Sequence, residues 1–388
     1  MLNFKYSIPT EIFFGEGQIS ALPSELLRHG NKVLLVYGGG SIKRSGLYDT
    51  IIKLLSEAGI QYWELAGVEP NPRVDTIRVG AAICKEHAID IVLAIGGGSS
   101  IDCAKVVAAA ANYEGDAWEL VLNPSEIKEV LPIASVLTIA ATGSEMDRIA
   151  VISNMQTNQK LATSHDAMRP CFAIMDPTYT YTVPEYQTAS GTADIISHVL
   201  ESYFVKTPGI YIQKRFCEAL LKTCLHYGRD ALARPDDYEA RANLMWASTL
   251  AINDLITYGT ERRWTVHPIE HVLSAYYDIT HGVGLAVLTP SWMRFVCRSP
   301  ANIPYFAEYA VNVWNLDGGL PQEILAQRAI RKTEEYFEQL GLPKRLRDLG
   351  MPDTLLEQMA AQVAGSATVG GFQPLTKEDV YEILKEAY

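Results

Sequence analysis

The sequence lacks the features of several classes of protein. Its 45 acidic residues outnumber its 33 basic residues, and the net charge of −12 leaves no basic face for nucleic acid or an anionic membrane. No apolar run approaches the ~20 residues that cross a bilayer. Residues 1–15 contain no apolar segment of the kind that a secretory signal needs. We therefore expect a cytoplasmic protein that binds neither nucleic acid nor membrane.

Cysteine and histidine are also scarce. The six cysteines form no Cys-x-x-Cys pair and have no regular spacing, which disfavours a disulfide framework and a thiolate zinc site. Only eight histidines occur among 388 residues, yet three of them lie in the segment HPIEHVLSAYYDITHG, residues 267–282. With 48% hydrophobic and 20% charged residues, the composition is that of a soluble globular protein.

The chain changes character near residue 183. Before this point, apolar runs of strand length alternate with amphipathic segments; the runs are NKVLLVYGGG, IDIVLAIGGG, LPIASVLTIAATG and CFAIMDP. Buried strands that are separated by helices predict a parallel α/β sheet. From Pro184 onward the strand runs disappear and apolar residues recur at helical spacing. We predict an α/β domain over residues 1–183 and an all-helical domain over residues 184–388.

Two glycine-rich turns follow predicted strands, in VLLVYGGGS (33–41) and in IVLAIGGGSSIDCAK (91–105). Glycine lets the backbone approach a ligand, and the start of a helix offers unpaired N–H groups to a phosphate. Neither turn fits G-x-G-x-x-G or G-x-x-x-x-G-K-[ST]. A single turn would be an ordinary tight turn, whereas two in succession favour a nucleotide. The segment TIAATGSE (138–145) is either a third ligand contact or another turn.

Two pairs of possible metal ligands occur in the helical half. Asp194 and His198 are four residues apart, as are His267 and His271, so each pair shares one face of a helix. His281 follows ten residues later. One carboxylate and several imidazoles suit Fe(II) or Zn(II), whereas calcium and magnesium prefer oxygen ligands. Each pair alone is explained by a helix-surface pair or a buried core histidine, but together they favour a metal site.

The segments GGGSSIDCAK, TIAATGSE, DPTYTYTVP, GTADIISHVLESY and HPIEH…DITHG together resemble the iron-containing (group III) alcohol dehydrogenases, and in particular their butanol dehydrogenase branch. The resemblance covers essentially the whole chain. It implies a dinucleotide-binding first domain and a helical second domain that holds one Fe(II) or Zn(II). The implied metal ligands are Asp194, His198, His267 and His281. His271 would lie beside the nicotinamide or the substrate and relay a proton.

The resemblance also implies which residues contact the cofactor. They are Gly38, Gly39, Gly40, Ser41, Asn71, Gly97, Gly98, Ser99, Asp102, Thr138, Thr142, Lys160 and Tyr179. NAD-preferring relatives usually carry Asp at the position of Gly38, where it repels a 2′-phosphate. Here the turn is uncharged, and Lys43 and Arg44 follow it. We therefore favour NADP(H) and keep NAD(H) as the alternative.

The implied reaction is the metal-dependent interconversion of short-chain aldehydes, such as butanal, and primary alcohols with NAD(P)H. The partner is then a small molecule, and the resemblance also implies a homodimer. Two alternatives remain: a glycerol-dehydrogenase-like polyol oxidoreductase, and a metal-dependent hydrolase, which would leave both glycine turns without a role. The four ligands carry one negative charge, so a divalent ion gives a site of about +1. Some relatives have Glu where this chain has Val272, so we expect no supporting acid at the site.

Overall fold

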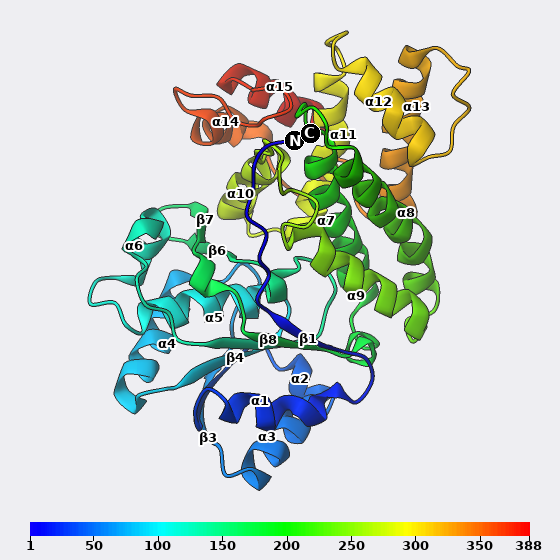
Figure 1. The fold of residues 1–388 in the computed structure, drawn as a ribbon. Coiled ribbons are helices and arrows are strands. Elements are labelled where there is room, and N and C mark those ends of the chain that lie inside the picture. The colour runs from blue at the N-terminus through cyan, green and yellow to red at the C-terminus, as the bar shows by residue number, and fades with distance from the viewer. The chain divides into compact units, whose positions relative to one another are not determined.

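The computed structural model describes residues 1–388, which form two compact units (Figure 1). The α/β unit comprises Ser7–Pro184 and Pro235–Asn253. The helical unit comprises Met1–Tyr6, Glu185–Arg234 and Asp254–Tyr388.

The α/β unit is built on a six-stranded sheet with the order β1-β8-β5-β4-β2-β3, in which every neighbouring pair is parallel. A separate antiparallel hairpin pairs β6 with β7. The strands are β1 (Glu11–Phe14), β2 (Lys32–Tyr37), β3 (Gln61–Ala66), β4 (Ile91–Gly96), β5 (Ile133–Leu137), β6 (Ile149–Asn154), β7 (Gln159–Ser164) and β8 (Phe172–Met175). The four apolar runs in the sequence form β2, β4, β5 and β8, so the predicted parallel sheet is confirmed.

Helices account for most of the remaining chain. They are α1 (Leu22–Leu27), α2 (Ser41–Arg44), α3 (Leu47–Glu57), α4 (Val74–His87), α5 (Gly98–Ala110), α6 (Ala117–Leu122), α7 (Glu185–Tyr203), α8 (Tyr211–Ala233), α9 (Tyr238–Ile252), α10 (Val266–Tyr277), α11 (His281–Val296), α12 (Ile303–Asn312), α13 (Gln322–Gln339), α14 (Leu356–Ala364) and α15 (Lys377–Ala387). The helical unit contains no strand beyond an isolated bridge between Val369 and Leu375. A mostly helical second half is therefore confirmed.

Both faces of the sheet are buried, as β2 illustrates. Val33 and Leu35 belong to a core that includes Leu26 of α1 and Ile51 of α3. Leu34 and its neighbours on the opposite face belong to a second core, with residues of α4 and α5. Figure 1 shows helices on both sides of the strands. Because both faces are covered, such strands appear in the sequence as continuous apolar runs rather than as alternating ones.

The units differ from the predicted domains in two segments. Helix α9 lies beyond residue 184 but packs in the α/β unit, where the rings of Trp246 and Phe14 are 5.8 Å apart. Residues 1–6 belong instead to the helical unit, where the backbone N–H of Leu2 donates to the carbonyl of Gly259 over 2.9 Å. Apolar periodicity predicts a helix and its buried face, but it does not identify the core that this face meets.

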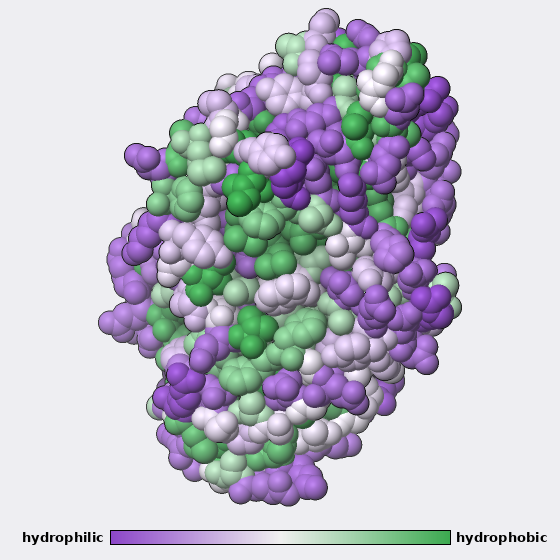
Figure 2. Space-filling model, turned by 45° about the vertical axis from the view of Figure 1, so that its right-hand side comes forward, coloured by the Kyte–Doolittle hydropathy of each residue, from purple (hydrophilic) through white to green (hydrophobic).

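The surface is mixed. The face in Figure 2 carries both hydrophilic and hydrophobic residues. The exposed apolar side chains include Met1, Leu2, Phe4, Tyr211 and Ile212. None of the helices has both the length and the hydropathy that a membrane span requires.

Candidate metal and dinucleotide sites

Helix α7 presents three chemically active side chains on one face. Asp194, His198 and Glu201 follow one another at spacings of four and three residues, which place them on the same side of the helix. The helix is buried from Thr188 to Tyr203, because it packs against both α8 and α11. The carboxylates and the imidazole therefore lie in the protein interior. An unpaired charge is costly there.

The two histidines that complete the cluster lie at the starts of helices. His267 is the second residue of α10, and Pro268 follows it in the first turn, where a missing N–H costs nothing. His281 is the first residue of α11. The carboxylate of Glu201 accepts hydrogen bonds from the backbone N–H groups of Val266 (3.1 Å) and His267 (2.9 Å). An acid of α7 thus satisfies the unpaired donors of α10 and fixes the position of His267.

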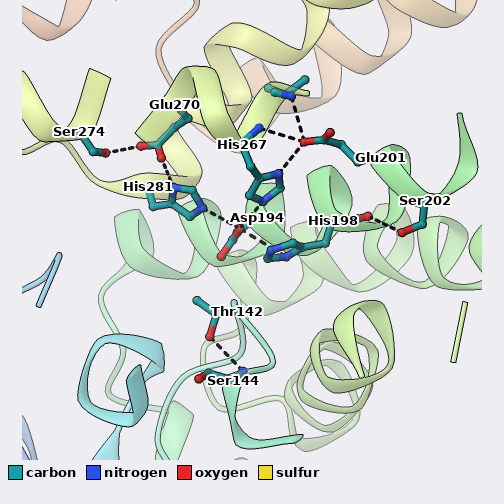
Figure 3. Close-up of polar contacts among 11 residues, drawn as sticks. Thr142, Ser144, Asp194, His198, Glu201, Ser202, His267, Glu270, Ser274 and His281 are labelled. Carbon is teal, nitrogen blue, oxygen red and sulfur yellow. Dashed lines mark hydrogen bonds and ion pairs between the residues drawn. The ribbon is translucent and has the colours of Figure 1, made fainter. Parts of the chain in front are cut away.

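Nitrogens of three predicted ligands, His198, His267 and His281, lie around one carboxylate oxygen of the fourth, Asp194 (Figure 3). From Asp194 Oδ1, the distances are 3.5 Å to His198 Nδ1, 3.8 Å to His281 Nε2 and 4.0 Å to His267 Nε2. These distances are too long for hydrogen bonds. Two atoms that each bind one tetrahedral ion at ~2.1 Å lie about 3.4 Å apart. The distances from Asp194 are therefore close to those between ligands that share one ion. The ligand atoms of Asp194, His267 and His281 also all lie within 4.8 Å of one another, a group that does not include His198.

The chemistry of the donor atoms also fits a divalent ion. His198 Nδ1 and His267 Nε2 are buried and have no hydrogen-bond partner. Burial, reinforced by the neighbouring His267 and His281, holds the pKa of His198 well below its ordinary value. The imidazole is therefore neutral and can donate its lone pair. A metal would satisfy buried nitrogens that are otherwise costly to leave unpaired.

Two carboxylates that were not predicted from the sequence support His267 and His281. Glu201 Oε1 lies 2.6 Å from His267 Nδ1, and Glu270 Oε2 is hydrogen-bonded to His281 Nδ1. We expected no supporting acid because residue 272 is Val. This expectation is wrong: Glu270, which precedes His271, supports His281 instead. Glu201 carried a signal in the sequence, since it follows His198 by three residues on the same helix.

His271, the predicted proton relay, lies beside the cluster. Its ring centroid is 5.4 Å from that of His281 and 6.3 Å from that of His267. It also belongs to a second group of close ligand atoms, with Glu270 and His281. The residue is partly exposed. The structure thus brings all three histidines of the segment together, and the division of roles among them stays a prediction.

The second glycine turn forms the start of α5 and admits no side chain. A Cβ at Gly98 would lie 2.3 Å from Thr142 Oγ1, and a Cβ at Gly97 would lie 2.4 Å from the side chain of Ile139. The backbone N–H of Thr138 donates to Gly96 over 3.0 Å. The predicted contacts Gly97, Gly98, Ser99, Thr138 and Thr142 therefore come together at the carboxyl ends of β4 and β5, where α/β sheets bind ligands.

A buried polar network lies under this turn. Asp102 accepts hydrogen bonds from Ser144 Oγ (2.5 Å) and the backbone N–H of Val151 (2.8 Å). Lys105, which sequence reasoning missed, is fully buried; its ammonium donates to Ser144 Oγ over 2.8 Å and pairs with Asp147. Both side chains therefore fasten residues 142–151, which include the start of β6, to α5. A lone lysine in the apolar run CAKVVAAA was the available signal.

The first glycine turn, Gly38 to Gly40 with Ser41, joins β2 to α2. Gly40 has φ = 100°, a conformation that favours glycine. Lys43 Nζ lies 4.0 Å from Glu64 and above the rings of Tyr37 and Tyr48, so its charge is already engaged. Arg44 is exposed, and its Nη1 lies 3.8 Å from the position that a Cβ of Gly40 would take. Of the two basic residues, Arg44 is thus the one available to a ligand at the turn.

The remaining predicted cofactor residues lie elsewhere in the α/β unit. The buried residues Asn71 and Lys160 lie in neighbouring segments. Ser153 connects them: its N–H donates to the carbonyl of Pro72 over 2.8 Å, and it faces Lys160 across the β6–β7 hairpin. Tyr179 lies in a short 3₁₀ helix (Pro177–Thr180) after β8. Burial, with a smaller effect of Asp176, raises the pKa of Tyr179 to about 12, so its hydroxyl stays protonated.

Comparison with known protein families decides the classification. Residues 9–177 match the family described as iron-containing alcohol dehydrogenase, and residues 188–388 match the Fe-containing alcohol dehydrogenase family, C-terminal. The chain belongs to the iron-containing alcohol dehydrogenase family. An iron-containing alcohol dehydrogenase is an oxidoreductase that combines a metal with a nicotinamide cofactor, so the predicted family, fold class and reaction class are confirmed.

Individual relatives agree with this membership. NADH-dependent butanol dehydrogenase A of Clostridium acetobutylicum is 55% identical over the full length of both chains. The NADPH-dependent aldehyde reductase YqhD of Escherichia coli is 39% identical over 90% of each chain. Among solved structures, NADH-dependent butanol dehydrogenase A of Thermotoga maritima is 39% identical, with a TM-score of 0.94 over 100% of this chain and 99% of that chain. This iron-containing alcohol dehydrogenase is thus similar to relatives with either cofactor in their names.

Proposed function

We propose that the protein is a metal-dependent NAD(P)H enzyme that interconverts short-chain aldehydes, such as butanal, and primary alcohols. The observation that carries the proposal is the convergence of three imidazole nitrogens within 3.5–4.0 Å of Asp194 Oδ1, in a buried site. The names of the similar butanol dehydrogenases and of the aldehyde reductase support the substrate class.

Each residue of the cluster then has a defined task. When bound, the metal would polarise the carbonyl oxygen of the aldehyde, and the reduced nicotinamide would supply the hydride. Asp194, His198, His267 and His281 would hold the ion. His271 would deliver a proton to the oxygen of the new alcohol, directly or through water. Iron is the family's metal by name, and both Fe(II) and Zn(II) suit these ligands.

The choice of cofactor depends on the turn at Gly38. No carboxylate follows β2 directly, so a 2′-phosphate meets no repulsion from the turn itself, and Arg44 is positioned to attract it. We propose that the enzyme accepts NADPH through Arg44 and also uses NADH. The name of the Clostridium relative favours NADH, and that of YqhD favours NADPH. The ratio of kcat/KM for the two cofactors decides the preference.

We propose a homodimer in which segment 3–15 pairs with its counterpart, since β1 lies at one edge of the sheet and offers an unpaired strand edge. We also propose a cytoplasmic enzyme, since all six cysteines are free thiols, as is usual in a reducing compartment.

The experiment that tests the function compares substrates on protein reloaded with Fe(II) or Zn(II). Butanal-dependent oxidation of NADH or NADPH is the expected result. Oxidation of glycerol with no turnover of butanal would favour the polyol oxidoreductase. Absence of nicotinamide oxidation or reduction with any of these substrates and metals would contradict the proposal and return attention to a hydrolase.

A further inference from the structure

Two of the four candidate ligands, His267 and His281, each contact a second carboxylate through the ring nitrogen that does not face Asp194 (Figure 3). Glu201 contacts Nδ1 of His267, and Glu270 contacts Nδ1 of His281. Both carboxylates are buried, Glu270 completely. In each case the other ring nitrogen, Nε2, is the one that faces Asp194. His198 is arranged differently, since its Nδ1 itself lies beside Asp194.

A carboxylate behind an imidazole determines which nitrogen carries the proton. An acceptor at Nδ1 holds the hydrogen there, and Nε2 is left with the lone pair that a metal needs. The carboxylate also restrains the ring from rotating away from the ion and makes the imidazole a stronger donor. The geometry therefore prepares His267 and His281 as ligands before any ion binds.

We propose that Glu201 and Glu270 are positioning residues that hold the ligand histidines in the metal-binding tautomer and set the affinity for the ion. This inference rests on the proposed metal site. The two acids do not contribute alike. Glu201 also bonds the first N–H groups of α10, so its loss disturbs a helix as well as a ligand. Glu270 accepts a hydrogen bond from the hydroxyl of Ser274, so this contact, like that with His281, joins two side chains.

The packing around Glu270 explains why residue 284, three positions after His281, is a glycine. A Cβ at Gly284 would lie 2.8 Å from Glu270 Cγ and 3.1 Å from its Oε1. The first contact is shorter than real Cβ atoms show and the second is tighter than most, so a side chain at residue 284 would displace the carboxylate. Gly284→Ala therefore perturbs the contact between Glu270 and His281 and leaves the charge unchanged.

The test uses Co(II) as the probe, in the absence of substrate and cofactor. The dissociation constant for Co(II) is measured by competition with a chelator, and the visible spectrum of the bound ion reports its ligand geometry. Glu270→Gln keeps the shape of the side chain and removes its charge. We expect it to weaken Co(II) binding about 10- to 100-fold and to shift the spectrum. Gly284→Ala should act in the same direction, and Glu201→Gln should also lower the melting temperature.

A matched control is Glu218→Gln. Glu218 is another buried carboxylate of the helical unit, bonded to Tyr203, Arg215 and Asn312 rather than to a histidine. This variant should leave both the Co(II) affinity and the spectrum unchanged. Wild-type affinity and spectrum in Glu270→Gln would overturn the inference, even if the variant were less stable. Failure of the wild-type protein to bind Co(II) would instead overturn the proposed metal site.

Discussion

Replacing Gly98 by alanine tests the account of the second glycine turn. The added Cβ would lie 2.3 Å from Thr142 Oγ1, 2.6 Å from its Cγ2 and 2.9 Å from its Cβ. Ordinary contacts begin at 3.4 Å, so the start of α5 and the loop that carries Thr142 must separate by about 1 Å. Thr142 cannot simply rotate away without loss, because its Oγ1 also accepts the N–H of Ser144 over 3.2 Å.

The size of the effect follows from this displacement. Overpacking of this kind costs ~1–3 kcal/mol, and a misplacement of ~1 Å at a binding loop can cost ~100-fold in function. We expect the dissociation constants for NADH and NADPH to rise about 10- to 100-fold, since both cofactors share the phosphates that this turn would hold. Metal affinity should stay at the wild-type value, because the histidine cluster belongs to the other unit.

The assay is titration of the purified variant with each reduced cofactor, followed by nicotinamide fluorescence, together with metal analysis and thermal unfolding. Gly318→Ala is the matched control, since a Cβ there meets only Val311 at 3.6 Å, an ordinary contact. Wild-type cofactor affinity in a well-folded Gly98→Ala protein would refute the assignment of this turn to the dinucleotide.

Four further substitutions test the remaining assignments. His267→Ala should abolish both metal content and turnover, whereas His271→Ala should retain the metal and lower kcat by about 10²–10⁴-fold; loss of metal from the second variant would count against its role as a proton relay. Arg44→Ala should lower kcat/KM for NADPH about 10-fold more than for NADH, as steady-state kinetics would show, and an unchanged ratio would remove Arg44 from cofactor choice. Lys105→Met leaves Asp147 buried without its cation and should therefore reduce the free energy of unfolding by ~3–5 kcal/mol. Urea denaturation measures this loss, and a value below ~1 kcal/mol would contradict the reasoning.

The central strands of the fold were predictable from sequence, and the peripheral ones were not. β4 reads IVLAIG because helices cover both of its faces, and only an apolar run satisfies that environment. β3, QYWELA, lies at the edge of the sheet and keeps polar residues, and β1 has only four residues. In the β6–β7 hairpin, β6 (IAVISN) begins with a short apolar run, whereas β7 (QKLATS) has none. Such strands depend on pairing that a local pattern does not reveal.

The site shows a similar division. Helical spacing predicted that Asp194 would lie beside His198 and His267 beside His271, because these are contacts within one helix. It could not predict that Glu201 of α7 would bond the start of α10, since that contact joins residues more than sixty positions apart. The same holds for Lys105 and Asp147, which meet only when α5 packs against residues 142–151. Contacts between elements required the structure.

The most direct test of the function is a metal titration of activity. Metal-free protein, with butanal and NADH or NADPH in excess, is titrated with Fe(II) under anaerobic conditions while the reduced nicotinamide is followed by its absorbance. We expect no turnover without metal and a linear rise in activity that ends near one equivalent of Fe(II) per chain. Full activity in the metal-free protein, or no activity at any ratio of Fe(II) or Zn(II), would contradict it.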